Sequence, residues 1–305
     1  MPSIAILASW EPWTPASFEN QMAGKPLTFE NHNRDVMGLT YVYPVVSRRA
    51  AGVSIGINLN TNHACNWACV YCQVPNLSRG SAPPTDLGRL RAELDLMLAE
   101  VLDGRFMETH VAEDLRRLND IAFSGNGEPT SADYFEEAVA IAIAALRHRA
   151  LLDRVKLVVI TNGSFAMQPD VQRAFKSMAQ AGGEVWFKVD RGRTEDTLRI
   201  NQVNLKPELQ LKRLAAAAQA CPTWIQTCMT AWDGASPNEE EVGAYLDLLR
   251  RALAQGIPLQ GVLLYSLARP SLQPEAARIA ALPQAWLENL GRQIAALGLA
   301  VRVTP

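Results

Sequence analysis

The chain has 305 residues, 48% of them hydrophobic, and a formal net charge of −2. It can therefore bury the core of one barrel-sized domain or of two small ones. No charge-free apolar run reaches the length of a membrane span, and the weak net charge argues against a general nucleic-acid coat. Five cysteines without a signal peptide indicate a reducing, cytoplasmic environment.

Residues 1–50 are expected to form an irregular N-terminal arm, because their apolar and aromatic residues follow no sustained period. Residues 40–49 favour a short edge strand interrupted by Pro44, since proline has no N–H group to give to a sheet. Arg48 and Arg49 are either contacts to a substrate or partner, or a solvated charge pair.

From Gly52 onward, strand and helix patterns alternate along the chain. Thr85 is the expected N-cap of the first helix, which ends before Gly104, and Asn238 is the expected N-cap of a later helix. Strands are predicted over 53–60, 121–123, 155–160, 184–190, 223–230, 259–267 and 299–303, and helices over 87–101, 131–146, 169–181, 207–218, 238–253 and 283–297.

Six strands that alternate with helices predict a parallel sheet, because each right-handed crossover returns a helix over the outer face. We expect this α/β sheet to curve into a partial (β/α)6 barrel over residues 51–270, with residues 271–305 adding a helix and a small strand that close it. Reactive groups in such folds gather at the carboxyl ends of the strands, since the loops there face the mouth.

The stretch from Asn60 to Gly80 carries Cys65, Cys69 and Cys72 in a Cys-x3-Cys-x2-Cys spacing. Three thiolates on one loop can hold three corners of a cuboidal iron–sulfur cluster, because thiolate is the ligand that these clusters use. The fourth iron would keep an open coordination position, so the loop indicates a reaction centre.

This spacing, with the aromatic Tyr71 just before the third cysteine, resembles the radical S-adenosylmethionine (SAM) superfamily. The resemblance implies one [4Fe–4S] cluster whose open iron is chelated by the amino and carboxylate groups of SAM. It also implies that an electron from the cluster breaks the C5′–S bond of SAM and releases a 5′-deoxyadenosyl radical, which takes a hydrogen atom from a substrate. Tyr71 would lie against the adenine.

Other interpretations of the cysteines stay open. A zinc-stabilised binding module would use the three thiolates with His63 as fourth ligand, although zinc sites usually come as two separated ligand pairs. A disulfide framework does not suit a reducing compartment. An iron–sulfur electron carrier that never cleaves SAM is the third alternative.

The second strand runs into Ser124–Thr130, SGNGEPT. Its glycines would let the backbone approach a ligand closely, with Glu128 as a carboxylate at the sheet edge. The segment resembles the "GGE" motif of the superfamily, with Asn126 inserted between Gly125 and Gly127, which implies that it holds the SAM amino group. An ordinary Gly-Pro turn is the alternative.

Polar residues also follow the later strands. Thr161 and Asn162 suit the ribose or the SAM carboxylate, or they form a turn. Lys188 and Asp190 share a strand face, so they would pair with each other, or the lysine would neutralise the SAM carboxylate. In the enzymes that the chain resembles, the sixth strand offers apolar side chains and backbone groups to adenine, and Leu264 lies in the corresponding strand here. The cofactor-binding candidates are Thr161, Asn162, Lys188, Asp190, Asn201, Gln226 and Leu264.

Arg79 and Arg269 are substrate candidates, because a guanidinium near the mouth can grip a carboxylate or phosphate; surface ion pairs are the alternative. Cys221 and Cys228 are expected to pack as small apolar residues. The motifs resemble the branch that includes the wyosine-base synthases, without their extra cysteine trio. The substrate is therefore expected to be a small molecule, a protein side chain or tRNA, and the chemistry implies a flavodoxin- or ferredoxin-type reductant.

Overall fold

Eight strands form one curved sheet in the computed structural model, which describes residues 27, 38–47 and 52–304. The strand order is β1-β2-β5-β6-β7-β8-β10-β12, with β1 and β12 at the two edges. The strands are β1 Val42–Ser47, β2 Gly52–Ile57, β5 Leu118–Phe123, β6 Lys156–Thr161, β7 Glu184–Lys188, β8 Thr223–Cys228, β10 Leu259–Tyr265 and β12 Val301–Thr304.

The six strands from β2 to β10 are parallel to one another throughout, which confirms the expected partial (β/α)6 barrel. β12 adds a parallel strand beside β10, as the pattern over 299–303 predicted. β1 runs antiparallel to β2 and passes through Pro44 without a break, because an edge strand has one side where no N–H donor is needed. The expected interruption at Pro44 is therefore wrong.

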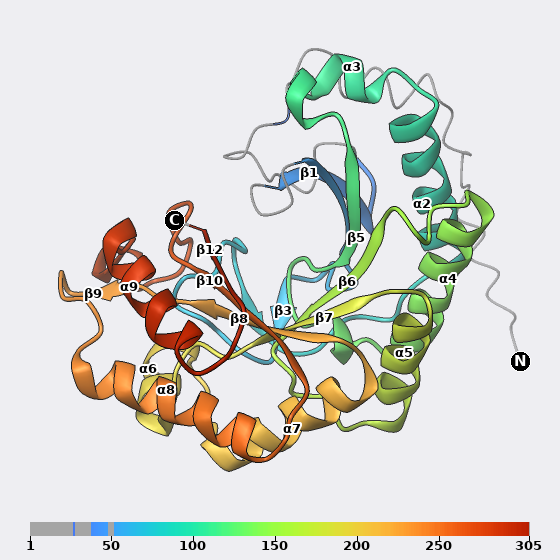
Figure 1. The fold of residues 1–305 in the computed structure, drawn as a ribbon. Helices are drawn as coiled ribbons and strands as arrows, with labels where there is room; N and C mark the ends of the chain where they lie inside the picture. Colours follow the sequence, from blue (N-terminus) through green and yellow to red (C-terminus); the bar gives the residue numbers. More distant parts are fainter. Residues whose placement is uncertain (1–26, 28–37, 48–51, 305) are drawn as a thin grey trace, which may run out of the picture.

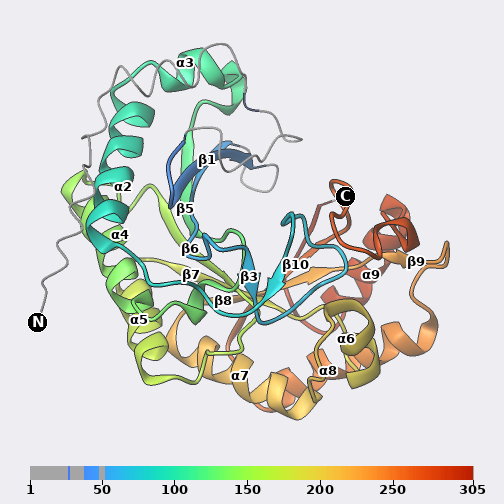
Figure 2. The same ribbon diagram turned by 180° about the vertical axis from the view of Figure 1, so that it is seen from behind.

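Helices cover the outer side of the curved sheet, and the opening lies between its two edges (Figures 1 and 2). The crossover helices alternate with the strands along the chain, as parallel pairing requires. The helices are α2 Leu87–Leu102, α3 Phe106–His110, α4 Phe135–His148, α5 Pro169–Gln180, α6 Thr194–Asn201, α7 Pro207–Ala220, α8 Glu239–Ala254 and α9 Gln284–Ala295.

Strand β7 shows how the two faces of the sheet differ. Val185 and Phe187 are buried in the main hydrophobic core, whereas Glu184, Trp186 and Lys188 on the opposite face are partly exposed. Since successive side chains of a strand point to opposite faces, the core lies between sheet and helices, and the concave face is left partly open. This open face is where a ligand has room.

Several local predictions need correction. The N-cap of α2 is Asp86, whose carboxylate accepts from the N–H of Arg89, and not Thr85. The helix expected from Ser131 begins only at Phe135, after a short 3-10 turn over Pro129–Ser131. Asn238 caps α8 as expected and forms a full capping box with Glu241.

Most of the expected N-terminal arm, including Arg48 and Arg49, lies outside the described residues. Four two-residue strands form two small ladders: β3 Ala64–Cys65 pairs with β4 Ser78–Arg79, and β9 Ala231–Trp232 pairs with β11 Ile279–Ala280. Within the described part of the chain, no helix has both the length and the apolar composition that crossing a membrane requires.

Candidate functional site

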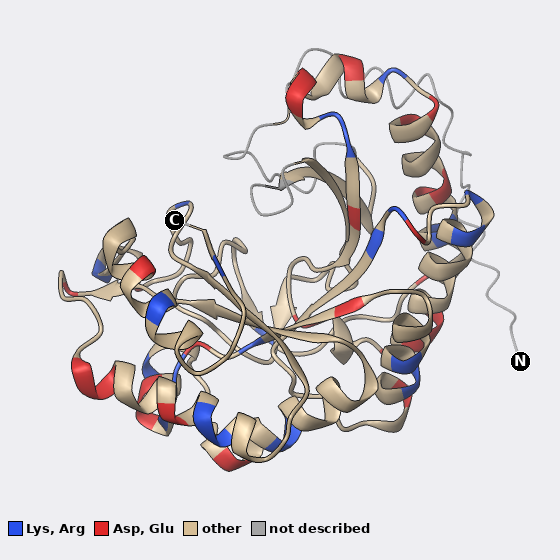
Figure 3. Cartoon of the chain, viewed as in Figure 1, with Lys and Arg blue, Asp and Glu red and all other residues tan. Residues whose placement is uncertain are grey.

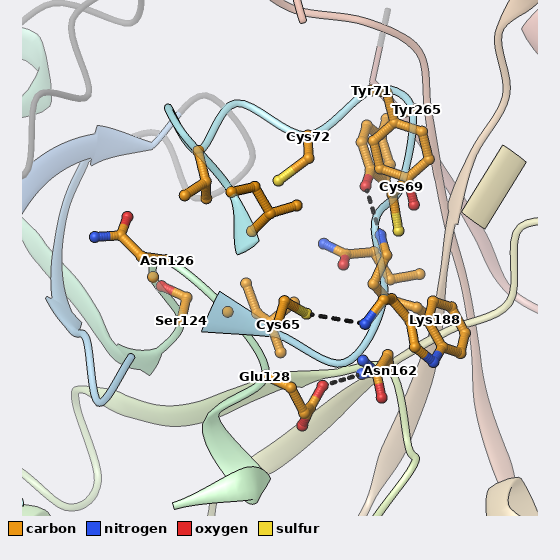
Figure 4. Close-up of a pocket in the computed structure, with 17 residues that line it drawn as sticks. Cys65, Cys69, Tyr71, Cys72, Ser124, Asn126, Glu128, Asn162, Lys188 and Tyr265 are labelled. Carbon is orange, nitrogen blue, oxygen red and sulfur yellow. Dashed lines mark hydrogen bonds between the residues drawn. The ribbon is translucent and has the colours of Figure 1, made fainter. Parts of the chain in front are cut away.

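A pocket of about 240 Å³ lies where the parallel strands end and the cysteine loop covers them. Figure 4 shows its labelled side chains, which come from the cysteine loop, the SGNGEPT loop and the ends of β6, β7 and β10. The lining residues are Cys65, Trp67, Cys69, Tyr71, Cys72, Val74, Leu77, Ser124, Gly125, Asn126, Gly127, Glu128, Ile160, Asn162, Lys188, Gln226 and Tyr265.

The cysteine loop is held from two sides. On one side, the backbone N–H groups of Ala68 and Val70 donate to the last carbonyl groups of α6, at 3.3 and 2.9 Å. On the other side, Ser271 donates to the carbonyl oxygen of Val70 at 2.6 Å, and Gln273 donates to those of Cys72 and Val74. Elements far apart in the sequence therefore position the three cysteines.

All three expected cluster ligands face this one pocket, and two of their sulfurs already accept hydrogen bonds. The N–H of Trp67 donates to Cys65 Sγ at 3.5 Å, and the amide of Asn201 donates to Cys69 Sγ at 3.3 Å. Burial raises the pKa of the Cys65 thiol to about 12 and that of Cys69 to about 11. Binding of a metal centre would thus have to release protons from these thiols.

The donor set fits a cluster better than a single metal ion. Among the described residues, no three or more His, Cys, Asp or Glu side chains lie close enough together to hold one ion. A tetrahedral zinc site needs such a convergence, whereas cysteines of a cuboidal cluster bind different iron atoms and stay farther apart. His63 does not line the pocket that the three cysteines share, and its Nδ1 lies 2.9 Å from the carbonyl oxygen of Pro75.

Two glycines allow the SGNGEPT loop to pack under the cysteine loop. A Cβ atom on Gly127 would lie 2.1 Å from the carbonyl oxygen of Ala64, directly before the first cysteine. Gly125 has a φ of 144°, and a Cβ there would lie 2.4 Å from Asn58 Oδ1. Larger residues at these positions would push the two loops apart.

Glu128 is buried, and its carboxylate joins the SGNGEPT loop to the end of β6. Oε1 accepts from the hydroxyl groups of Thr130 and Thr161, at 2.5 and 2.6 Å, and Oε2 accepts from the N–H of Asn162 at 2.6 Å. Burial raises the pKa of Glu128, and these hydrogen bonds oppose that rise. Glu128 lines the pocket while it fixes the end of β6, and its expected role in holding the SAM amino group stays a prediction.

Tyr71, Lys188 and Asp190 form one polar cluster beside Cys69. The hydroxyl of Tyr71 donates to Asp190, while Lys188 Nζ lies 4.9 Å from the Tyr71 ring centroid and 4.0 Å from Asp190 Oδ2. The expected pairing of Lys188 with Asp190 is therefore present. Burial is the largest single influence on Lys188 and acts to lower its pKa, but Asp190 together with the neighbouring Tyr265, Cys69 and Cys228 raises the pKa overall, so the lysine keeps its positive charge in the pocket.

The other strand-end candidates divide into two groups. Gln226 and Asn162 line the pocket as expected. The Thr161 hydroxyl donates its hydrogen bond to Glu128, and Leu264 lies in the hydrophobic core with its side chain fully buried. The Leu264 side chain therefore lies in the core and not in the pocket, and a contact of adenine with the backbone of this strand stays a prediction.

Arg79 and Arg269 do not line the pocket. The guanidinium of Arg79 donates to the carbonyl oxygens of Asn66 and Gln202, so it ties the cysteine loop to the end of α6. The role of both arginines in substrate binding stays a prediction. Cys221 and Cys228 are buried, in agreement with packing roles.

Sequence reasoning missed Trp67 and Ile160 as lining residues, whereas Ser124 belongs to the expected SGNGEPT segment. Trp67 lies inside the cysteine motif, and its indole N–H donates to Ser164 at 3.1 Å. Ser124 shares a hydrogen bond of 2.9 Å with Tyr43, from edge strand β1. Ile160 lies near the end of a predicted strand, where pocket residues are expected. The sequence does not show which face of the sheet its side chain occupies, so its contact with the pocket was not predicted.

The comparisons with known proteins give a weak sequence match and a clear match of fold. No protein-family model matches the sequence. Two curated relatives, each called UPF0026 protein, from Helicobacter pylori strains J99 and 26695, are 28% identical over 138 residues. This match covers 44% of the chain but only 38% of the length of each relative.

Among solved structures, a radical SAM methyltransferase from Sphaerobacter thermophilus has a TM-score of 0.57 at 13% identity, over 86% of this chain and 68% of that one. SuiB from Streptococcus suis, bound to S-adenosylmethionine, has a TM-score of 0.48 at 10% identity, over 81% of this chain and 45% of that one. The first of these establishes that the chain has the kind of fold found in radical SAM enzymes.

Proposed function

We propose that the chain is a radical SAM enzyme, which binds a [4Fe–4S] cluster through Cys65, Cys69 and Cys72 and removes a hydrogen atom from a substrate. The observation that carries the proposal is the convergence of the three cysteines on one pocket at the carboxyl ends of a partial barrel. Neither a zinc module nor a simple electron carrier accounts for the polar strand ends that line the same pocket.

The residues of the pocket have distinct tasks in this proposal. When bound, the cluster supplies the electron for reductive cleavage of SAM. The cation of Lys188 would hold the SAM carboxylate, and the SGNGEPT backbone with Glu128 would hold its amino group. The Tyr71 ring, fixed through its hydroxyl by Asp190, would lie against the adenine.

Anaerobic reconstitution tests this proposal. We expect about four iron atoms per chain, and formation of 5′-deoxyadenosine when SAM and dithionite are added. Replacing any one of the three loop cysteines by serine should lower the iron content and abolish SAM cleavage, because thiolate is the required ligand.

Cys221→Ala is the matched control, since Cys221 is a buried cysteine of the core and lies outside the pocket. It should keep both iron and SAM cleavage. Zinc in place of iron would favour the binding module, and a full cluster that neither binds nor cleaves SAM would favour the electron carrier; either result would end the proposal.

For the substrate, we propose a small molecule or a protein side chain ahead of tRNA. Acidic and basic residues are interspersed over the outer helices in the view of Figure 3, and the net charge is −2. RNA binding draws on clustered Lys and Arg, so the surface favours a substrate held by the pocket itself. A flavodoxin- or ferredoxin-type protein would deliver the electron.

An electrophoretic mobility shift assay with total tRNA at low salt tests whether tRNA is a weaker candidate substrate than a small molecule or a protein side chain. We expect no retained RNA at protein concentrations in the micromolar range, where non-specific binders already retain it. A retained band that weakens steeply as salt is added would reverse the order in favour of tRNA.

A further inference from the structure

Asn201, the last residue of α6, is fully buried against the cysteine loop. Its backbone carbonyl accepts from the N–H of Ala68, and its side-chain amide lies 3.3 Å from Cys69 Sγ. The same amide nitrogen lies 2.7 Å from Asp190 Oδ2 and 3.3 Å from the Tyr71 hydroxyl oxygen. One residue thus contacts the loop backbone, a candidate ligand and the polar cluster.

The orientation of this amide follows from its neighbours. An ionised carboxylate only accepts hydrogen bonds, so the NH₂ group of Asn201, and not its oxygen, must face Asp190. The amide oxygen then points away, where it is buried without a hydrogen-bond partner among the described residues. One amide hydrogen goes to Asp190, and the second lies between the sulfur of Cys69 and the hydroxyl oxygen of Tyr71, each 3.3 Å from the nitrogen.

We infer that Asn201 is a positioning residue that tunes the reduction potential of the cluster through an N–H···S hydrogen bond to Cys69. The inference rests on the proposed function, because it needs a cluster on Cys69. Hydrogen bonds to the sulfurs are among the factors that set the potential of an iron–sulfur cluster. An N–H donor stabilises the added negative charge of the reduced form more than it stabilises the oxidised form.

An EPR-monitored redox titration of reconstituted protein tests the inference. Asn201→Leu keeps a side chain of similar size and removes the donor. We expect the equilibrium constant for reduction to fall by up to about tenfold, which is a decrease of up to about 59 mV in midpoint potential for a one-electron couple.

The control is Gln273→Met. Gln273 anchors the same loop, but its amide donates to the carbonyl oxygens of Cys72 and Val74 and not to a sulfur. The midpoint potential of the cluster in Gln273→Met should equal that of the wild type. This result would distinguish an effect on the potential through the sulfur from an effect of anchoring the loop. Asn201→Ala is a second donor-free variant for the case in which leucine prevents folding.

An unchanged potential in either folded Asn201 variant would overturn the inference. Loss of the cluster from both folded Asn201 variants would also overturn it, because the amide would then be needed to retain the cluster and not to tune its potential. A wild-type protein that takes up no iron is a different result, because it refutes the proposed function before Asn201 is tested.

Discussion

At the level of single residues, the site depends on buried polar groups that form hydrogen bonds with one another. Glu128 accepts from two hydroxyl groups and two backbone N–H groups, and each donor offsets part of the cost of burying its charge. The sequence indicated Glu128 as a carboxylate at a strand end, but not that Thr161, 33 residues later, would bind it.

Thr161→Val should destabilise the fold by about 1.5–3 kcal/mol where Glu128 is ionised, because a hydrogen bond to a charged group is lost. The pKa of Glu128 is raised in the folded chain, so the folded state keeps its proton to higher pH than the unfolded state, and stability falls as pH rises through that window. The penalty of the variant should grow over the same rise in pH. Urea unfolding from pH 4.5 to pH 9 measures it.

Thr227→Val is the control for this pH dependence. Thr227 is an equally buried threonine, but its hydroxyl pairs with the carbonyl oxygen of Val189 and the hydroxyl of Tyr245. Neither partner titrates over that pH range, since burial raises the pKa of Tyr245. A penalty at Thr161 that is as flat with pH as the one at Thr227 would contradict the assignment.

At the scale of elements, the crossover strands and helices were predictable, whereas α6 was not. Helix α6 has only eight residues, too few for an apolar period, and it buries Asp196, Thr197 and Asn201 alongside Ile200. On its buried face Asn201 contacts the cysteine loop and the polar cluster, while Asp196 pairs with Arg193 and Arg199. Helical periodicity detects apolar cores, so a helix that serves a polar site escapes it.

The packing of the SGNGEPT loop under the cysteine loop leads to a prediction for Gly127→Ala. The added Cβ would meet the Ala64 carbonyl oxygen at 2.1 Å, so we expect a loss of about 1–3 kcal/mol in stability and a lower iron content after reconstitution. Unfolding curves and iron analysis measure the two effects.

Gly243→Ala provides the comparison. Gly243 lies inside α8, and a Cβ there meets no atom within 4 Å. That variant should gain about 0.5–1 kcal/mol from the better helix propensity of alanine and should bind iron normally. Equal effects of the two substitutions would mean that the contact between the loops is not tight.

At the scale of the whole molecule, edge strand β1 is tied to the helical layer by a buried carboxylate. Glu93 of α2 accepts from the N–H groups of Thr40, Tyr41 and Val42, and it pairs with Arg89 at 2.8 Å. The strand thereby keeps its place at the edge of the sheet, where Tyr43 reaches Ser124 of the pocket.

Glu93→Gln should cost about 1.5–3 kcal/mol, because the amide nitrogen of glutamine must face one of these N–H donors. Amide hydrogen exchange should quicken in residues 40–43 before it quickens elsewhere. Asp95→Asn, at an exposed position of the same helix, should change neither quantity measurably. Unaltered exchange in β1 would show that its pairing with β2 is sufficient.

Features that depend on neighbouring residues could be predicted from the sequence: the alternation of strands and helices, the parallel sheet that this implies, and three cysteines on one loop after the first parallel strand. Which side chains meet became clear only from the folded chain. Asn201 contacts Cys69 across 132 positions, and Leu264 faces the core while Ile160 faces the pocket. The physical reason is that register, strand curvature and helix placement set such contacts, and these follow from packing of the whole chain.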